Sequence, residues 1–155
     1  MDQPPVVHLS DFLSEFLEGQ GFDPGLLASD FAEWKTGWPK HEYDSIHFGK
    51  DSAYATPAVG GRNNILKHVH LRPLLDPDED DEWMSDFRYR RRKTSDRCLV
   101  YAERKAGAGP YLLIAILEEP DAHLIARMTT QAHKDVMNEL ADVADQFITF
   151  GLVDF

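Results

Sequence analysis

An alternation of polar and apolar side chains marks residues 65–72 as the clearest pattern in the chain. It divides the segment into two faces: Ile65, Lys67, Val69 and Leu71 on one, and Leu66, His68, His70 and Arg72 on the other. A period of two is that of a β-strand, whose successive side chains point to opposite faces of a sheet. Residues 97–104 and 111–117 are predicted as two further strands, joined by a hairpin connection over residues 105–110.

Helical signals precede these strands. Ser10 is a typical N-cap, and it predicts a short helix that ends at Gly19 or Gly21. Asp23 followed by proline is a favourable start for a second helix, and Gly37 supplies its end. Residues beyond it, from 38 to 63, are predicted to form a long ordered loop because they are interrupted by proline and glycine.

A third helical region follows the last strand, after Pro120. Apolar residues recur there at helical spacing, with a possible break at Thr129 and Thr130. We interpret them as core: Ile125, Met128, Ala132, Val136, Leu140, Val143 and Phe147. The order of two helices, three strands and a helix predicts an α+β fold with an antiparallel sheet, in a single domain over residues 1–155.

Composition indicates a soluble protein. No stretch approaches the roughly 20 apolar residues of a membrane span, and the N-terminus lacks the basic start and apolar stretch of a signal peptide. Cys98 is the one cysteine, which excludes an internal disulfide and a cysteine-based zinc site. We therefore expect a cytoplasmic protein with no membrane partner.

The formal net charge of -11 argues at first against a nucleic-acid partner. The charges are unevenly distributed, however. Residues 62–75 and 87–95 contain no Asp or Glu, and they hold eight of the 16 Lys and Arg residues. The acidic run 76–82 lies between them and is predicted to be an exposed loop, replaceable by a Gly/Ser linker with little effect on the thermal midpoint.

Candidate chemistry lies on the predicted strand over residues 65–72. His68, His70 and Arg72 share one face, and two imidazoles with a guanidinium suit phosphodiester cleavage by the neighbouring 2′-hydroxyl. A half-exposed strand face with no chemistry explains the pattern equally well. Zinc is the third alternative, but two histidines do not complete a zinc site, so we expect no metal.

The second basic window predicts RNA binding. Tyr89 lies among its arginines, and an aromatic ring among cations is a common way to hold single-stranded RNA. Tyr101, in the next strand, either faces the histidines or belongs to the core. The predicted RNA-binding residues are Lys50, Arg72, Arg88, Arg90, Arg91 and Arg92.

An ordered set of short motifs resembles the YafO toxin family. The motifs are FGKDSAY at 48–54, HVHL at 68–71, KTSD at 93–96, LVY at 99–101, LLIAIL at 112–117, AH at 122–123 and AR at 126–127. Each is weak alone, and together they span roughly residues 26–147. The resemblance implies a RelE/ParE-like fold, cleavage of mRNA at the ribosome without a metal or cofactor, and control by a cognate antitoxin protein.

The resemblance implies candidate functional residues at the positions that match the family's motifs. They are Lys50, Asp51, Tyr54, His68, His70, Lys93, Asp96, Tyr101, His123 and Arg127. The predicted catalytic residues are His68, His70, Lys93, Asp96 and Tyr101. From chemistry, either histidine is a general acid or base, Lys93 and Arg72 contact the phosphate, and Asp96 orients a neighbour. His123 and Arg127 are either part of the site or structural.

The sequence also departs from the family in ways that bear on dependence on the ribosome. Lys50 stands where the family more often has arginine, and the net charge of -11 is unusual for a protein that docks on ribosomal RNA. The alternative is a non-catalytic binding, immunity or regulatory protein on the same fold, whose acidic surface meets a basic partner. A gyrase-poisoning toxin is less favoured because such a protein does not need the histidines.

Overall fold

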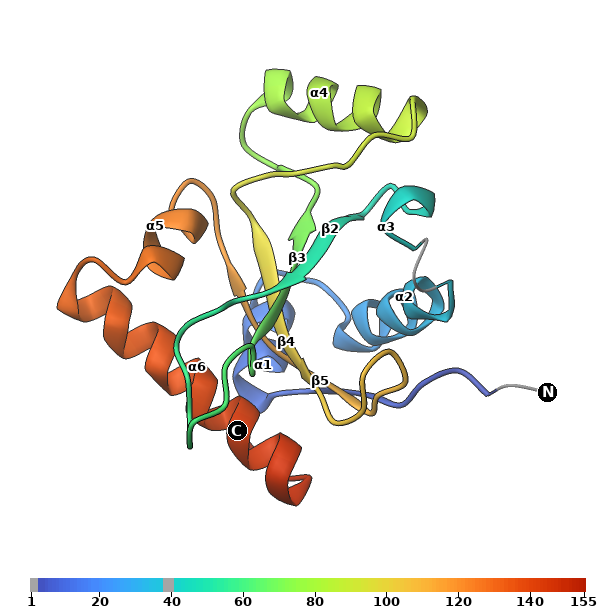
Figure 1. The fold of residues 1–155 in the computed structure, drawn as a ribbon. Helices are drawn as coiled ribbons and strands as arrows, with labels where there is room; N and C mark the ends of the chain where they lie inside the picture. Colours follow the sequence, from blue (N-terminus) through green and yellow to red (C-terminus); the bar gives the residue numbers. More distant parts are fainter. Residues whose placement is uncertain (1–2, 38–40) are drawn as a thin grey trace.

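A five-stranded mixed sheet forms the centre of the chain, in the order β1-β5-β4-β3-β2 (Figure 1). The computed structural model describes residues 3–37 and 41–155. The strands are β1 (Val7–Leu9), β2 (Phe48–Ala53), β3 (Lys67–Leu71), β4 (Cys98–Glu103) and β5 (Tyr111–Leu117). β1 runs parallel to β5, and the other neighbours are antiparallel.

Helices cover both faces of this sheet (Figure 1). They are α1 (Asp11–Gly19), α2 (Pro24–Thr36), α3 (His41–Asp44), α4 (Pro77–Arg88), α5 (Ala122–Arg127) and α6 (Gln131–Phe150). Helices α1 and α2 pack on one face and α6 on the other. None of the helices in the described residues has both the length and the apolar character needed to cross a lipid bilayer.

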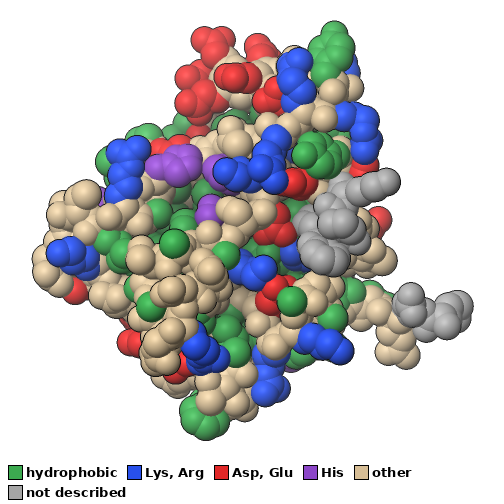
Figure 2. Space-filling model, viewed as in Figure 1, with side chains coloured by type: hydrophobic (Ala, Val, Ile, Leu, Met, Phe, Trp, Pro, Cys, Tyr) green, Lys and Arg blue, Asp and Glu red, His purple; other side chains and the backbone are tan. Residues whose placement is uncertain are grey.

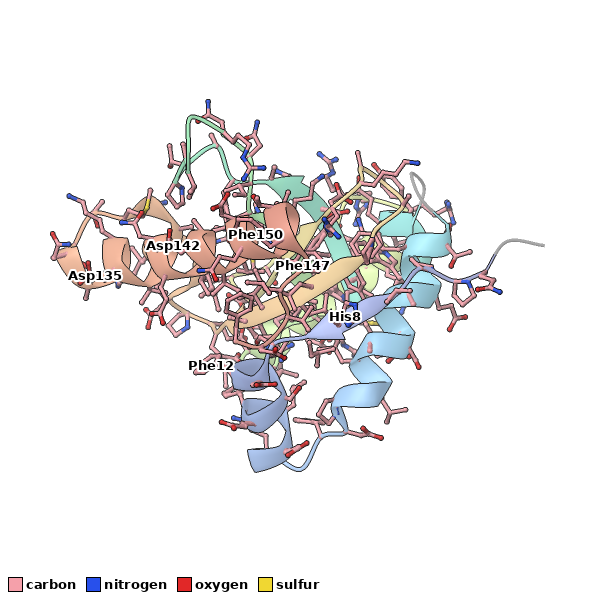
Figure 3. All side chains as sticks on the ribbon, turned by 90° about the horizontal axis from the view of Figure 1, so that it is seen from below. His8, Phe12, Asp135, Asp142, Phe147 and Phe150 are labelled. Atoms are coloured by element: carbon pink, nitrogen blue, oxygen red, sulfur yellow. The ribbon has the colours of Figure 1, made fainter. Side chains whose placement is uncertain are left out.

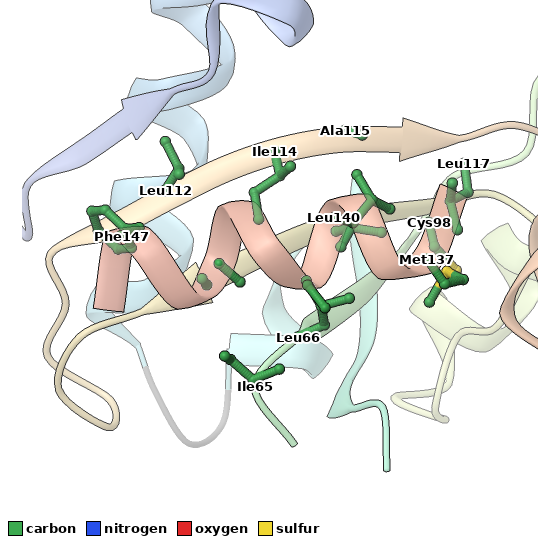
Figure 4. Packing of buried hydrophobic residues seen from close by; sticks show 14 of the residues in the cluster. Ile65, Leu66, Cys98, Leu112, Ile114, Ala115, Leu117, Met137, Leu140 and Phe147 are labelled. Carbon is green, nitrogen blue, oxygen red and sulfur yellow. The ribbon is translucent and has the colours of Figure 1, made fainter. Parts of the chain in front are cut away.

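The core under α6 is aliphatic (Figure 4). Met137, Leu140 and Phe147 of α6 lie in one buried cluster with Leu112 and Ile114 of β5. Figure 3 shows α6 lying along β5 toward β1, where the Phe147 ring is 6.4 Å from the His8 ring. The predicted break before this helix is confirmed by its N-cap at Thr130.

The core under α1 and α2 is aromatic. Phe31 is fully buried, and its ring lies 5.0 Å from the Tyr101 ring, 5.3 Å from the Tyr111 ring and 6.0 Å from the Phe48 ring, all edge to face. Such edge-to-face pairs add to the stabilisation from burial itself. One buried charge, that of Lys35, lies among these rings.

The predicted caps and central strands are confirmed. The side chains of Ser10 and Asp23 accept hydrogen bonds from the first turns of α1 and α2, and Gly37 follows the end of α2. β3 is a strand, as its period of two indicated, and it lies antiparallel to β4 as predicted. The hairpin between β4 and β5 is confirmed as well, so the predicted α+β fold is correct.

Two strands were not predicted, and the sheet is mixed and not purely antiparallel. β1 is only three residues long, too short for a period of two to be recognised. β2 has the sequence FGKDSA, whose pairing with β3 shifts register between Phe48 and Asp51, so its polar residues do not alternate. The predicted loop over residues 38–63 is therefore wrong at α3 and β2; its Trp38 and Pro39 lie outside the described residues.

The acidic run is also not a loop, because it begins helix α4. The Asp76 side chain accepts a hydrogen bond from the Asp78 amide as N-cap, and Pro77 occupies the first turn. Acidic residues fill the first turn and Arg88 the last, an arrangement that the helix dipole stabilises. The loop prediction failed because six of the seven residues from 76 to 82 are carboxylates and show no apolar period. The buried residue of this helix, Trp83, comes only after them.

We predict that Trp83→Ala lowers the free energy of unfolding by about 3–5 kcal/mol. The Trp83 side chain is 1% exposed, and its Nε1 donates to the Ile46 carbonyl at 2.7 Å, so the variant loses both burial and a hydrogen bond. Urea unfolding monitored by circular dichroism measures the change. Leu75→Ala is the control, because Leu75 is 70% exposed and its loss should change stability by less than about 0.5 kcal/mol. Equal stabilities of the two variants would contradict this anchoring role.

Candidate active site

Three imidazole rings lie in a row on the face of the sheet that α5 and α6 cover. The His68 and His70 ring centres of β3 are 5.7 Å apart, and the His70 and His123 ring centres are 5.6 Å apart. His123 belongs to the start of α5. We call His68, His70 and His123 the histidine row. Figure 2 shows histidines gathered beside Lys and Arg side chains, below the acidic side chains of α4.

His68 is held between the side chains of Tyr54 and Ser52. Its ring stacks on the Tyr54 ring at 3.8 Å with an interplanar angle of 6°, and its Nε2 lies 3.3 Å from the Ser52 hydroxyl. Burial, and after it the neighbouring His70, lower the pKa of His68 to about 4. His68 is therefore uncharged at neutral pH.

His70 is held by the backbone. Its Nδ1 lies 2.7 Å from the carbonyl oxygen and 2.9 Å from the amide nitrogen of Ser95, and the side chain is almost fully buried. Burial lowers the pKa of His70. With Nδ1 fixed against Ser95, Nε2 is the ring nitrogen left to exchange a proton with a bound group.

His123 is positioned by a carboxylate. One oxygen of Asp96 lies 2.7 Å from the His123 amide nitrogen and 2.8 Å from its Nδ1. The imidazole is about half exposed, at 53%. A carboxylate at Nδ1 fixes ring orientation and tautomer, so the exposed Nε2 becomes the exchanging nitrogen. Sequence periodicity did not place His123 beside the other histidines, because it comes from a different element 53 residues after His70.

Strand β2 brings a cation to the histidine row. Ser52 is the register partner of His68, so the two side chains face the same way. Lys50, two positions earlier, lies close enough that its charge lowers the pKa of both His68 and His70, after burial. Its backbone N–H donates to the Lys93 carbonyl at 2.8 Å, which holds this part of the strand.

Two of the predicted catalytic residues lie apart from the row. Lys93 is fully buried, and its Nζ donates to the Glu42 carbonyl at 2.6 Å near the rings of Trp83 and Phe87. Tyr101 pairs with Lys67 and not with His68, so it faces the aromatic core. The structure thus brings His68, His70 and Asp96 together with His123, Tyr54 and Lys50, which the family resemblance had also named.

Three of the arginines predicted to bind RNA are exposed and paired with acidic residues. Arg90 binds Asp44 at 3.0 Å, Arg91 binds Asp86 at 2.8 Å and Arg92 binds Glu42 at 2.9 Å. Arg88 ends helix α4 with an exposed side chain.

Arg72, at the end of β3, contacts Asp80 through Nε at 2.7 Å and Nη2 at 3.0 Å. The basic stretches contain no Asp or Glu in sequence, but in the folded chain their arginines contact carboxylates of α3 and α4.

A metal site is not evident from the donor geometry. In residues 3–37 and 41–155, no three or more His, Cys, Asp or Glu side chains are grouped so that they can hold a metal ion. The histidine row has its rings more than 5 Å apart, and Asp96 and Ser95 already occupy one nitrogen of His123 and of His70.

The chain matches the family described as Toxin YafO, type II toxin-antitoxin system, over residues 33–149. Neither the curated proteins nor the solved structures give a match. The matched region begins within α2 and includes every member of the histidine row, Lys50 and the arginines of α4 and the segment after it.

We predict that His68 makes the fold acid-sensitive. Its pKa of about 4 in the folded chain lies below the usual 6.5, so its contribution to stability is complete above pH 6.5 and is lost as pH falls toward 4. His68→Gln should reduce the loss of unfolding free energy between pH 7.5 and pH 4.5 by about 2 kcal/mol. Urea titrations at both values measure it. His47→Gln, at an exposed position, should keep the parent's loss; a His68 variant as acid-sensitive as the parent would refute the assignment.

Proposed function

Because the chain belongs to the YafO toxin family of type II toxin-antitoxin systems, we propose that it is a toxin that acts as an endoribonuclease on mRNA. Cleavage of mRNA at the ribosome, in the cytoplasm, then stops translation, and a cognate antitoxin holds the enzyme inactive. We infer a RelE/ParE-type arrangement for its α+β fold on the same ground.

The histidine row carries this proposal. It combines two imidazoles whose ring centres are 5.6 Å apart, each with Nδ1 held by another group, and a lysine beside them. General acid–base chemistry on a phosphodiester needs a proton acceptor on one side of the phosphate and a donor on the other. A cation next to the phosphate stabilises the charge that develops between them.

In the proposed reaction, Nε2 of His70 accepts the proton of the 2′-hydroxyl. The 2′-oxygen attacks the adjacent phosphorus, and the bond from phosphorus to the 5′-oxygen breaks. His123 donates a proton to that leaving oxygen, so that the products are a 2′,3′-cyclic phosphate and a 5′-hydroxyl. Lowering of the His70 pKa by burial suits the role of base, since the ring is uncharged at neutral pH.

The remaining predicted catalytic residues are proposed to position this pair. Asp96 orients His123, and His68 fills the space between Tyr54 and His70. Lys93 and Tyr101 are proposed to position β2 through hydrogen bonds to two of its residues. The Lys93 carbonyl accepts from the Lys50 amide, and the Tyr101 hydroxyl donates to Asp51, the next residue in the strand.

RNA binding is proposed for the arginines beyond α4 with Tyr89. The Tyr89 side chain is 65% exposed, and the Arg91 guanidinium lies 5.3 Å from its ring centre. A nucleotide whose base stacks on Tyr89 would have its phosphate near Arg90, Arg91 and Arg92. Lys50 and Arg72 are proposed to hold the strand nearer the histidine row.

We predict that His70→Ala and His123→Ala each lower mRNA cleavage by about 10²–10⁴-fold, because each removes one proton-transfer group. His68→Ala should lower it less, since this ring positions the others. Primer extension on mRNA with intact ribosomes measures cleavage, and growth after induced expression reports it in cells. His47→Ala is the matched control, because His47 is exposed and outside the row. Cleavage that survives loss of both His70 and His123 would place the chemistry elsewhere.

The acidic surface favours a second candidate, a non-catalytic protein that binds a basic partner. Its supporting observation is the pairing of Arg90, Arg91 and Arg92 with carboxylates. Induced expression separates the two candidates. A parent chain that leaves growth and mRNA unchanged in cells lacking the antitoxin supports the binding protein.

A further inference from the structure

A groove on the other face of the sheet is not used by the proposed reaction. It has a volume of about 750 Å³ and lies between α2, the end of β3 and the start of α4. Its apolar lining includes Phe22, Leu26, Leu27, Leu71 and Leu74. Leu71 belongs to the aromatic core, whereas His70 next to it in the strand faces the histidine row, so the groove and the row open on opposite sides of β3.

Three large apolar side chains of this groove are exposed to solvent. Phe22 is 59% exposed, Leu26 63% and Leu74 64%. The backbone holds them in place. The amides of Leu74 and Leu75 donate to one carboxylate oxygen of Glu119 at 2.5 and 3.0 Å, and Asp23 caps the helix that carries Leu26. A fixed apolar surface exposed to water is typical of a binding site for a partner.

The charges around the groove are mainly negative. Asp23, Asp30, Asp76 and Asp80 line it. Arg72 is paired with Asp80, and Arg97 with Glu118 outside the lining, which leaves Asp23, Asp30 and Asp76 as the remaining carboxylates of the groove.

A smaller hollow of about 360 Å³ adjoins the groove and shares Asp30 and Phe48 with it. It adds the carboxylate of Glu33 and that of Asp44, which is paired with Arg90 at the surface. The acidic lining therefore continues along α2 toward α3, in a chain of net charge -11.

We propose that this groove binds a segment of the cognate antitoxin that carries two or three large apolar residues flanked by lysine or arginine. Apolar side chains would bury Phe22, Leu26 and Leu74, and the basic flanks would meet Asp30 and Asp76. Membership of a toxin-antitoxin family supplies the partner, and the acidic rim selects its chemistry. The inference does not depend on the ribonuclease mechanism, because the histidine row lies on the opposite face.

The test measures binding of the product of the reading frame next to this chain's gene, by calorimetry at two salt concentrations. The full chain is co-expressed with that product, separated in denaturant and refolded, with circular dichroism as the check on folding. Leu26→Glu and Leu74→Glu should each raise the dissociation constant by about 30-fold or more. Asp30→Lys should raise it as well and reduce the dependence of binding on salt.

Phe12→Glu and Phe150→Glu are matched controls. Both side chains are exposed, at 65% and 71%, and both lie away from the groove, on α1 and at the end of α6 (Figure 3). They should change the dissociation constant by less than about threefold. Groove variants that bind as tightly as the parent would overturn the proposal, as would a parent that does not bind this product.

A second copy of the chain is the competing occupant of the groove. Light scattering that shows a parent dimer dissociated by Leu26→Glu would establish it and overturn the proposal. Because every readout is binding or assembly, failure of the ribonuclease proposal leaves this test intact.

Discussion

A buried ion pair fixes the strand on which the proposed site depends. Lys35 of α2 donates to Asp51 of β2 at 2.6 Å and to the Tyr101 hydroxyl at 2.8 Å, and Tyr101 donates to Asp51 at 2.5 Å. Burial lowers the pKa of Lys35, and Asp51 acts in the opposite direction. Removing one member of such a pair leaves an uncompensated buried charge, at a cost of about 3–5 kcal/mol. The network therefore selects one position of β2 against α2 and β4, and with it the positions of Lys50 and Ser52.

The two faces of β3 contribute to the two proposed sites, one on each side of the sheet. His68 and His70 face α5 and α6, while Val69 and Leu71 enter the aromatic core and the edge of the groove. A shift of one residue in register would exchange these faces. Burial on both sides opposes such a shift, so the proposed chemistry and the proposed docking surface are held at a fixed separation by the same five residues of strand.

The sequence predicted what depends on local periodicity and capping. The strand predicted over residues 65–72 and found at residues 67–71 follows from neighbouring residues, as do the caps at Ser10 and Asp23 and the break before α6. It did not predict what depends on distant partners. β2 is a strand because β3 pairs with it, and α4 is anchored by Trp83 donating to Ile46. For the site, periodicity put His68 and His70 on one face, while the proximity of His123 and the enclosure of Lys93 required the packing of α5 and α3.

The net charge does not argue against the proposed RNA binding, because the strength of each ion pair depends on its exposure. Arg90 and Arg91 keep more than half of their side-chain surface exposed in their pairs with Asp44 and Asp86. Exposed pairs of this kind contribute only about 0–1 kcal/mol, so a phosphate can replace the carboxylate at little cost. Lys35, with 2% of its side chain exposed, cannot make that exchange without unfolding its surroundings. Burial therefore separates the cations that hold the fold from the exposed cations to which we assign the proposed RNA binding, and the net charge of -11 does not distinguish the two groups.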